Sequence, residues 1–171
     1  MRWNAGFSIY ELMVVIAIIA VLAAIAVPNM IGWRNRAKLG DGVRDIYSAF
    51  QLAKARAAKE NADITLTFAP TGATGREYAL FVDDGAGSVD SDGDGVLDGA
   101  GNGEIDGTET VFLRDRIPAG VKIDSTTFGD DSVTFNGSGL PDGIGSVDIV
   151  NSAGEKRSLS LSIAGRVKVA Y

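Results

Sequence analysis

Residues 6–31 read GFSIYELMVVIAIIAVLAAIAVPNMI and decide how the rest of the chain is organised. From Leu12 to Val27 every residue is Leu, Met, Val, Ile or Ala. With the flanks 7–10 and 30–31 the run reaches about 25 residues, or about 37 Å of helix, which is enough to cross a hydrocarbon core of about 30 Å. The stretch therefore predicts a membrane-spanning helix over residues 7–31.

One ionisable side chain, that of Glu11, lies within this run. A carboxylate at membrane depth is costly unless it is neutralised or paired, so it marks a functional position. Two simpler interpretations compete with a functional one. A secretory signal peptide would have a shorter apolar core, followed by a small-residue cleavage site. A plain membrane anchor explains the hydrophobicity but leaves Glu11 and the Gly-Phe pair at residues 6–7 without a role.

Gly6, Phe7 and Glu11 together resemble the processing site of type IV prepilins and of the pseudopilins of type II secretion. In that family a short leader ends in Gly, the mature chain begins with Phe, and Glu is its fifth residue. Pro28 falls where the family's helix commonly kinks, whereas Tyr10 departs from the usual neighbour of the Glu. The resemblance implies a pilin fold of the α+β class, with a long N-terminal helix packed on antiparallel β-sheet.

The resemblance also implies how the N-terminus matures. A prepilin peptidase of the inner membrane is expected to remove the leader, residues 1–6, by cutting between Gly6 and Phe7, and then to N-methylate Phe7. The freed amine is expected to pair with Glu11 of a neighbouring subunit, because opposite charges in a medium of low dielectric favour docking in one register. Glu11 is then an assembly residue with no catalytic role.

The charges beside the apolar run bear on its orientation. Arg34, Arg36 and Lys38 follow the run, whereas Arg2 precedes it, and the positive-inside rule alone would place the C-terminal side in the cytoplasm. The processing motif requires residues 1–6 to be inside. We therefore expect a single-pass protein of the bacterial inner membrane with a periplasmic C-terminal domain.

The composition restricts the chemistry of the chain. The 171 residues include no His and no Cys, which removes disulfides, the usual zinc ligands and the commonest nucleophile–base pairs. A net charge of −6 disfavours nucleic-acid coating as the bulk behaviour. The carboxylates lie in Gly-rich sequence without an apolar pocket that could raise a pKa. We expect a protein that is not an enzyme and requires no cofactor.

The pattern of apolar residues divides the rest of the chain into a helix and a β domain. After Pro28 they recur at three- and four-residue intervals, which predicts an amphipathic helix over 32–62, bent or loosened at 28–32 and 40–42. The period then changes to two, which predicts a β domain over 63–171. Strands are expected at 64–68, 77–82, 110–113, 121–123, 132–135, 146–150, 158–163 and 166–170, the last two forming a hairpin.

Two further stretches resemble the GspH/FimT group of minor pilins: YSAFQLAKARAAKEN at 47–61 and LSIAGRVK at 161–168. The resemblance implies a minor pseudopilin of the type II protein secretion system, built into a periplasmic pseudopilus near its tip. Its expected partners are other pilin or pseudopilin subunits, the prepilin peptidase and secreted cargo. Two alternatives stay open: a FimT-like minor type IV pilin that binds DNA, and a major pilin subunit.

An acidic Gly/Asp loop over 83–109 carries no basic residue. Part of it has the spacing of an EF-hand calcium loop, although position 12 is Gly101 and not the usual bidentate Glu. A calcium site and a solvated loop are the two interpretations. The candidate Ca²⁺ ligands are the side chains of Asp90, Asp92, Asp94 and Asp98 and the carbonyl of Val96.

Basic residues near the C-terminus are the candidate DNA contacts. Alternation places Arg166 and Lys168 on one face of the last strand, where Lys156 and Arg157 could join them. The other interpretation is a solvated face of an edge strand that discourages aggregation. Lys168 stands where the FimT group carries a second Arg, and Lys cannot make the same bidentate phosphate contact, so DNA is the less favoured partner.

Overall fold

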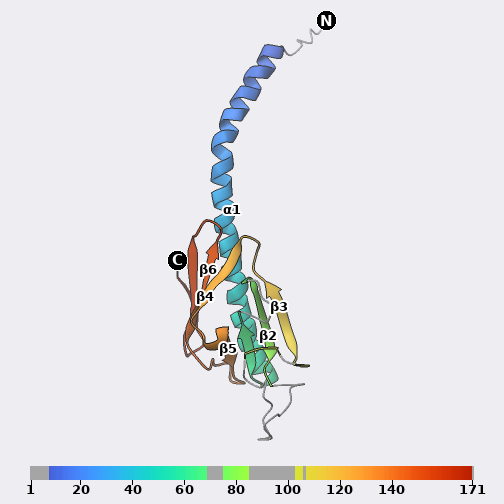
Figure 1. The fold of residues 1–171 in the computed structure, drawn as a ribbon, viewed down its shortest axis with the longest axis vertical. Helices are drawn as coiled ribbons and strands as arrows, with labels where there is room; N and C mark the ends of the chain where they lie inside the picture. The colour runs from blue at the N-terminus through green and yellow to red at the C-terminus, as the bar shows by residue number, and fades with distance from the viewer. Residues whose placement is uncertain (1–7, 69–74, 85–102, 106, 171) are drawn as a thin grey trace.

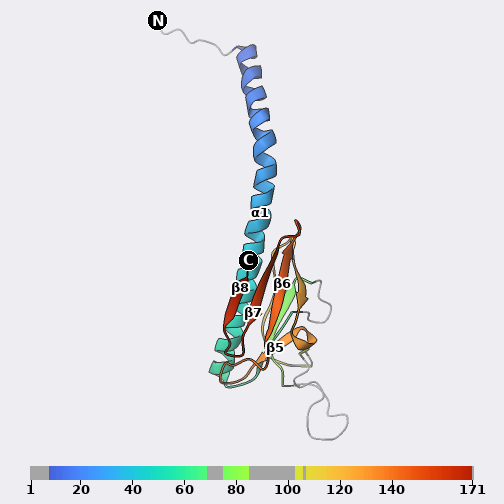
Figure 2. The same ribbon diagram turned by 90° about the vertical axis from the view of Figure 1, so that its left-hand side faces the viewer.

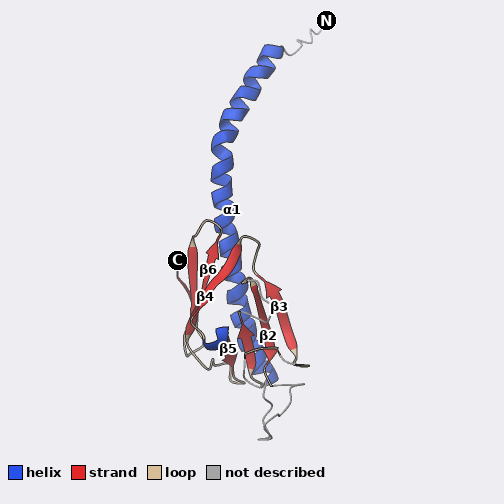
Figure 3. Ribbon diagram, viewed as in Figure 1, coloured by secondary structure: helices blue, strands red, loops and turns tan. Residues whose placement is uncertain are grey.

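One long helix carries a β domain on its C-terminal half (Figure 1). The computed structural model describes residues 8–68, 75–84, 103–105 and 107–170. Helix α1 (Ile9–Glu60) extends well beyond the domain at its N-terminal end, and helix and strands are coloured separately in Figure 3. This is the predicted α+β arrangement of a long helix packed on antiparallel sheets.

The strands of the described residues form two antiparallel sheets, with the orders β3-β2-β1-β5 and β4-β6-β7-β8. Strands β7 and β8 pair with Leu161 opposite Val167, which agrees with the predicted terminal hairpin. The last strand begins at Val167, so the prediction that it includes Arg166 is wrong by one residue. The strands are β1 (Ile64–Thr67), β2 (Glu77–Val82), β3 (Val111–Arg116), β4 (Val121–Thr126), β5 (Ser132–Phe135), β6 (Gly145–Asn151), β7 (Lys156–Leu161) and β8 (Val167–Ala170).

Helix α1 runs without interruption through Pro28 and through Gly40 and Gly42. Above the domain it curves gently (Figure 1), and Pro28 lies inside it, where its missing N–H removes one helical hydrogen bond. The predicted loosening at 40–42 is wrong. Gly42 is buried, and the nearest atom to a methyl group placed there would be Cγ1 of Val121, at 3.3 Å, so glycine allows the helix to approach β4 closely.

The helix ends at Glu60, two residues before the predicted limit at 62. Asn61 has φ 48° and ψ 46°, a left-handed conformation that asparagine tolerates better than most residues, and its N–H donates to the carbonyl of Ala57. This cap closes the last turn and redirects the chain into β1.

The core lies between the C-terminal half of α1 and the two sheets. Figure 2 shows β6, β7 and β8 side by side along this half of the helix. Phe50 is 1% exposed, and its ring centroid lies 5.7 Å from that of Phe68, 6.2 Å from that of Phe128 and 6.4 Å from that of Phe135. Burying such a side chain contributes about 2–3 kcal/mol, so this aromatic cluster fixes the helix on the domain. The buried residues of the helix are Leu39, Gly42, Val43, Ile46, Ala49, Phe50, Ala53 and Ala57.

Candidate assembly site

The N-terminal half of α1 has no protein around it. Every residue from Ile9 to Ile31 is exposed, and α1 is long and apolar enough to cross a membrane. A bare apolar helix of this length is stable only in lipid or against other apolar helices. This half of the helix is therefore the candidate surface for membrane insertion and for assembly.

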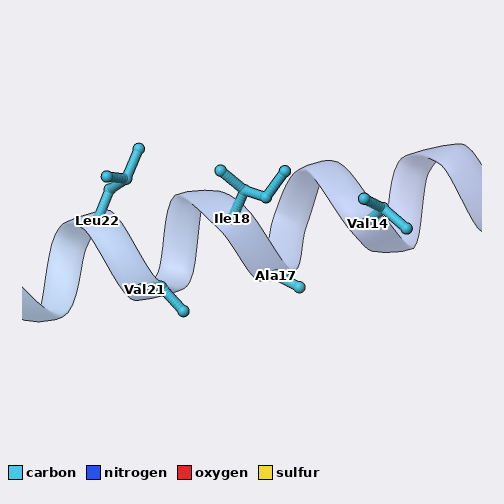
Figure 4. A pocket seen from close by; sticks show the side chains of 5 residues that line it. All are labelled: Val14, Ala17, Ile18, Val21 and Leu22. Atoms are coloured by element: carbon cyan, nitrogen blue, oxygen red, sulfur yellow. The ribbon is translucent and has the colours of Figure 1, made fainter.

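A shallow apolar groove of about 360 Å³ lies along this bare half of the helix. Figure 4 shows its lining side chains, which follow the spacing i, i+3, i+4, i+7, i+8 of one helical face. The small side chain of Ala17 lies between two larger neighbours in this row. The groove is lined by Val14, Ala17, Ile18, Val21 and Leu22.

Glu11 lies in the first turn of α1 and is exposed. A carboxylate in this position interacts favourably with the positive end of the helix dipole. Within the described part of the chain Glu11 forms no ion pair, so its charge is available to a group from outside the subunit. Gly6 and Phe7, the predicted cleavage and methylation residues, lie outside the described residues.

A set of polar contacts fixes the helix where it leaves the β domain. Nε of Arg36 donates to Oε1 of Glu155 at 3.1 Å, and Nζ of Lys38 donates to the carbonyl of Ala119 at 2.8 Å. The buried side chain of Asn151 reaches the carbonyl of Asn35 at 3.4 Å. Hydrogen bonds from Asn151 and then from Arg36 lower the pKa of Glu155, which keeps it ionised. Sequence reasoning missed this junction, whose signal is the run of cations directly after the apolar stretch.

The candidate calcium ligands Asp90, Asp92, Asp94, Val96 and Asp98 lie outside the described residues, and the calcium site stays a prediction. In the segments that the structure does describe, no three acidic side chains are grouped so that they could hold a metal ion. One contact at the base of the acidic loop lies within the described residues. The backbone N–H of Gly103 donates to Oδ2 of the buried Asp83 at 2.8 Å, which holds Gly103 against the first residue of the loop.

The four candidate DNA contacts do not lie together on one surface. Lys156 forms an ion pair with Asp124 of β4, which raises the pKa of Lys156 and lowers that of Asp124. Arg157 alternates with Lys156 along β7 and so lies on the face that carries the buried Leu159.

The other two candidates lie elsewhere on the hairpin. Lys168 is opposite Ser160 on the exposed face, whereas Arg166 belongs to the turn that enters β8. This turn is at the opposite end of β7 from Lys156.

A bare apolar helix half joined to a β domain is the architecture of the type IV pilin and pseudopilin superfamily, and it fits a membrane-anchored subunit. A family model described as "Type II transport protein GspH" matches residues 42–165, and one described as "Prokaryotic N-terminal methylation motif" matches residues 3–27. Since the first match covers most of the chain, the protein belongs to the GspH family. Subunits of this superfamily are structural, which confirms the expectation of a protein that is not an enzyme.

Individual relatives come from type IV pili. The chain is 30% identical over 105 residues to the type IV wide pilus major component PilA4 of Thermus thermophilus, a match that covers 52% of this chain and 80% of PilA4. It is 41% identical over 51 residues to the type IV major pilin protein PilA of Myxococcus xanthus, which covers 30% of this chain and 23% of that protein. The crystal structure of the type IV minor pilin FimU of Pseudomonas aeruginosa has the same fold, with a TM-score of 0.55, 16% identity, and coverage of 81% of this chain and 92% of FimU.

Proposed function

We propose that this chain is a minor pseudopilin of a type II secretion system, anchored by residues 9–31 in the inner membrane and built into a periplasmic filament near its tip. The observation that carries the proposal is that one unbroken helix is bare and apolar in one half and forms the core of a β domain in the other. The bare half spans about 35 Å, which matches a bilayer of about 30 Å. The same surface packs against the helices of other subunits after assembly.

The groove of Figure 4 supports the proposal that this half of the helix contacts lipid before assembly and the helices of neighbouring subunits after it. Lipid tails are as apolar as leucine side chains, so leaving the bilayer for a helix bundle costs little in hydrophobic energy. Small residues such as Ala17 allow close packing between helices, which favours association. The bare half therefore suits both environments.

Glu11 is proposed to specify the assembly register. Prepilin peptidase would cut between Gly6 and Phe7, and the new amine of Phe7 would pair with Glu11 of a neighbouring copy. An unpaired carboxylate at membrane depth is costly, so the correct register is favoured over registers that leave Glu11 alone. The absence of an ion pair for Glu11 within the described residues supports this role.

The test of this role follows processing and filament incorporation separately. A Glu11→Ala chain should be inserted and should lose Met1–Gly6, as measured by mass spectrometry, but should be missing from sheared filaments. The matched control is Glu60→Ala, which removes a carboxylate at the other end of the same helix. Normal incorporation of Glu11→Ala would refute the register role. Retention of Met1–Gly6 in cells with active peptidase would refute the assignment as a processed pseudopilin.

The pilus relatives support a second candidate, a subunit of a type IV pilus, because the match to PilA4 covers 80% of that protein. Deletion of the gene separates the two systems. Loss of secreted proteins with intact surface pili supports the secretion proposal, whereas loss of pili with normal secretion supports the second candidate. The abundance of the chain in sheared filaments distinguishes a minor from a major subunit.

A further inference from the structure

The β domain begins almost directly where the apolar helix surface ends. Ile31 is the last residue of the exposed apolar half, and Leu39 is the first buried residue of the domain core. Residues 32–38 between them correspond to about 10 Å of helix. The polar region on each side of a bilayer is of similar depth, about 5–8 Å. The near end of the domain therefore lies at the level of the lipid headgroups.

The residues in this short interval have the character of a membrane interface. Trp33 is 66% exposed, although it is large and apolar, and tryptophan is enriched at the level of the headgroups. Arg34 is exposed and has no ion pair with any residue that the structure describes. Arg36 contacts Glu155, and its side chain is nevertheless two-thirds exposed. These side chains face the medium that surrounds the helix.

Four cations surround the helix here, and we call Arg34, Arg36, Lys38 and Arg157 the basic collar. Arg34 and Lys38 are four residues apart and share one face, whereas Arg36 lies on another. Nη1 of Arg157 lies beside Gly40, one turn beyond Arg36.

The basic collar brings four cations together in a chain that is acidic as a whole. Glu155 contacts Arg36 from the β6–β7 turn, and Asp41, three residues beyond Lys38, pairs with Arg44. The chain as a whole carries a net charge of −6. The collar is therefore a basic patch at the end of the domain nearest the apolar half of the helix.

We infer that the basic collar binds the headgroups of anionic phospholipids and holds the β domain of the unassembled subunit against the bilayer surface. The inference rests on the proposed insertion of residues 9–31, because insertion brings the collar to the headgroups. Phosphate groups of anionic lipids attract the cations of the collar within one Debye length of the surface, the exposed Arg34 above all. The contact is released when the subunit leaves the bilayer for a filament.

Trp33 provides a direct probe of this contact. The chain has two tryptophans, at positions 3 and 33, so Trp3→Phe leaves Trp33 as the single emitter in the full chain. The protein is placed in nanodiscs that contain brominated phosphatidylglycerol or brominated phosphatidylcholine, and quenching of Trp33 gives the relative binding constant of the two lipids. We expect about fivefold preference for the anionic lipid for each exposed cation that contacts headgroups. Salt at 1 M should reduce the preference to near one, since the Debye length falls to about 3 Å.

The decisive variant is Arg34→Gln, since Arg34 has no structural contact in the described residues that its loss would disturb. It should reduce the preference for phosphatidylglycerol about fivefold. Lys59→Gln is the matched control, because it removes the same charge about 37 Å further along the same helix. It should leave the preference unchanged.

The outcomes separate the collar from the insertion on which it rests. Equal quenching of Trp33 by both lipids refutes the collar and leaves the insertion standing. Equal losses of preference in Arg34→Gln and Lys59→Gln also refute the collar, because net charge and not position would then set the preference. Absence of quenching by either lipid refutes both the insertion and the collar.

Discussion

Gly42 offers a sharp test of how closely the helix approaches the β domain. A glycine inside a helix is disfavoured by about 1 kcal/mol relative to alanine, so alanine should stabilise the chain wherever there is room. At Gly40 there is room, because the nearest atom to an added methyl group is Nη1 of Arg157, at 3.6 Å, the mobile end of a long side chain. At Gly42 the methyl group would lie 3.3 Å from Cγ1 of Val121 and 3.7 Å from Cβ of Ile117.

The expected free energies of unfolding follow from these distances. Gly40→Ala should raise the free energy of unfolding by about 0.5–1 kcal/mol. Val121 and Ile117 are buried and cannot easily move, so overpacking at Gly42 should cost about 1–3 kcal/mol and cancel or exceed the helix gain. Gly42→Ala should therefore be less stable than the wild type, by up to about 2 kcal/mol.

The measurement is guanidinium denaturation of the full chain in detergent, followed by near-ultraviolet circular dichroism of the domain. A double-mutant cycle with Val121→Ala adds a second readout. The shorter side chain makes room for the methyl group, so the two substitutions should couple favourably by about 0.5–3 kcal/mol. Equal stabilisation by Gly40→Ala and Gly42→Ala, with no coupling to Val121, would show that the close approach is not the reason for glycine at position 42.

Three further outcomes are expected. Burial, and then the negative charges of Asp115 and Asp41, raise the pKa of Asp45, so its ionised form destabilises the fold. Asp45→Asn should therefore raise the free energy of unfolding at pH 7, where Asp45 is ionised, but not at pH 3. Equal effects at both pH values would contradict this. Calcium at 5 mM should stabilise the fold by about 1.4 kcal/mol if the dissociation constant is about 0.5 mM, and the melting temperature should rise accordingly. Asp92→Asn should abolish this rise, and a wild-type melting temperature that calcium does not change would exclude the site. A gel-shift assay at low salt should show no binding of DNA, because the four candidate cations are dispersed; retardation that Lys168→Gln abolishes would restore the DNA proposal.

Local patterns in the sequence were sufficient for the elements of the fold. The pattern of residues 64–68 and 77–82 places β1 and β2 within one residue of their observed bounds, although alternation predicts one exposed face and both strands are buried on both faces. The change of period after residue 62 likewise predicts the end of α1 to within two residues.

The division of the strands into two sheets could not be predicted in this way. Strand β5 pairs with β1 across more than sixty residues of chain. Long-range pairing of this kind depends on how complete elements pack together, and no local pattern encodes it.

For a similar reason, the parts of the candidate site that depend on local spacing were predicted, and the parts that depend on contacts between distant residues were not. Glu11 and Pro28 are recognisable from their spacing along one helix, and the structure places both in α1. The junction of Arg36 with Glu155 joins residues that are 119 positions apart, so the run of cations after the apolar stretch marks only the helix side of it and spacing does not identify Glu155. The grouping of four basic residues near the C-terminus fails because residues that are close in the sequence lie on opposite faces, or at opposite ends, of the β7–β8 hairpin.

The continuity of α1 has a mechanical consequence. From Ile9 to Glu60 the helix is one continuous, gently curved element of about 78 Å, unbroken between its two environments. A force or torque applied to the membrane end of the helix is therefore transmitted along it to the two sheets. A machine that lifts or turns this subunit at its membrane end therefore moves the β domain with it.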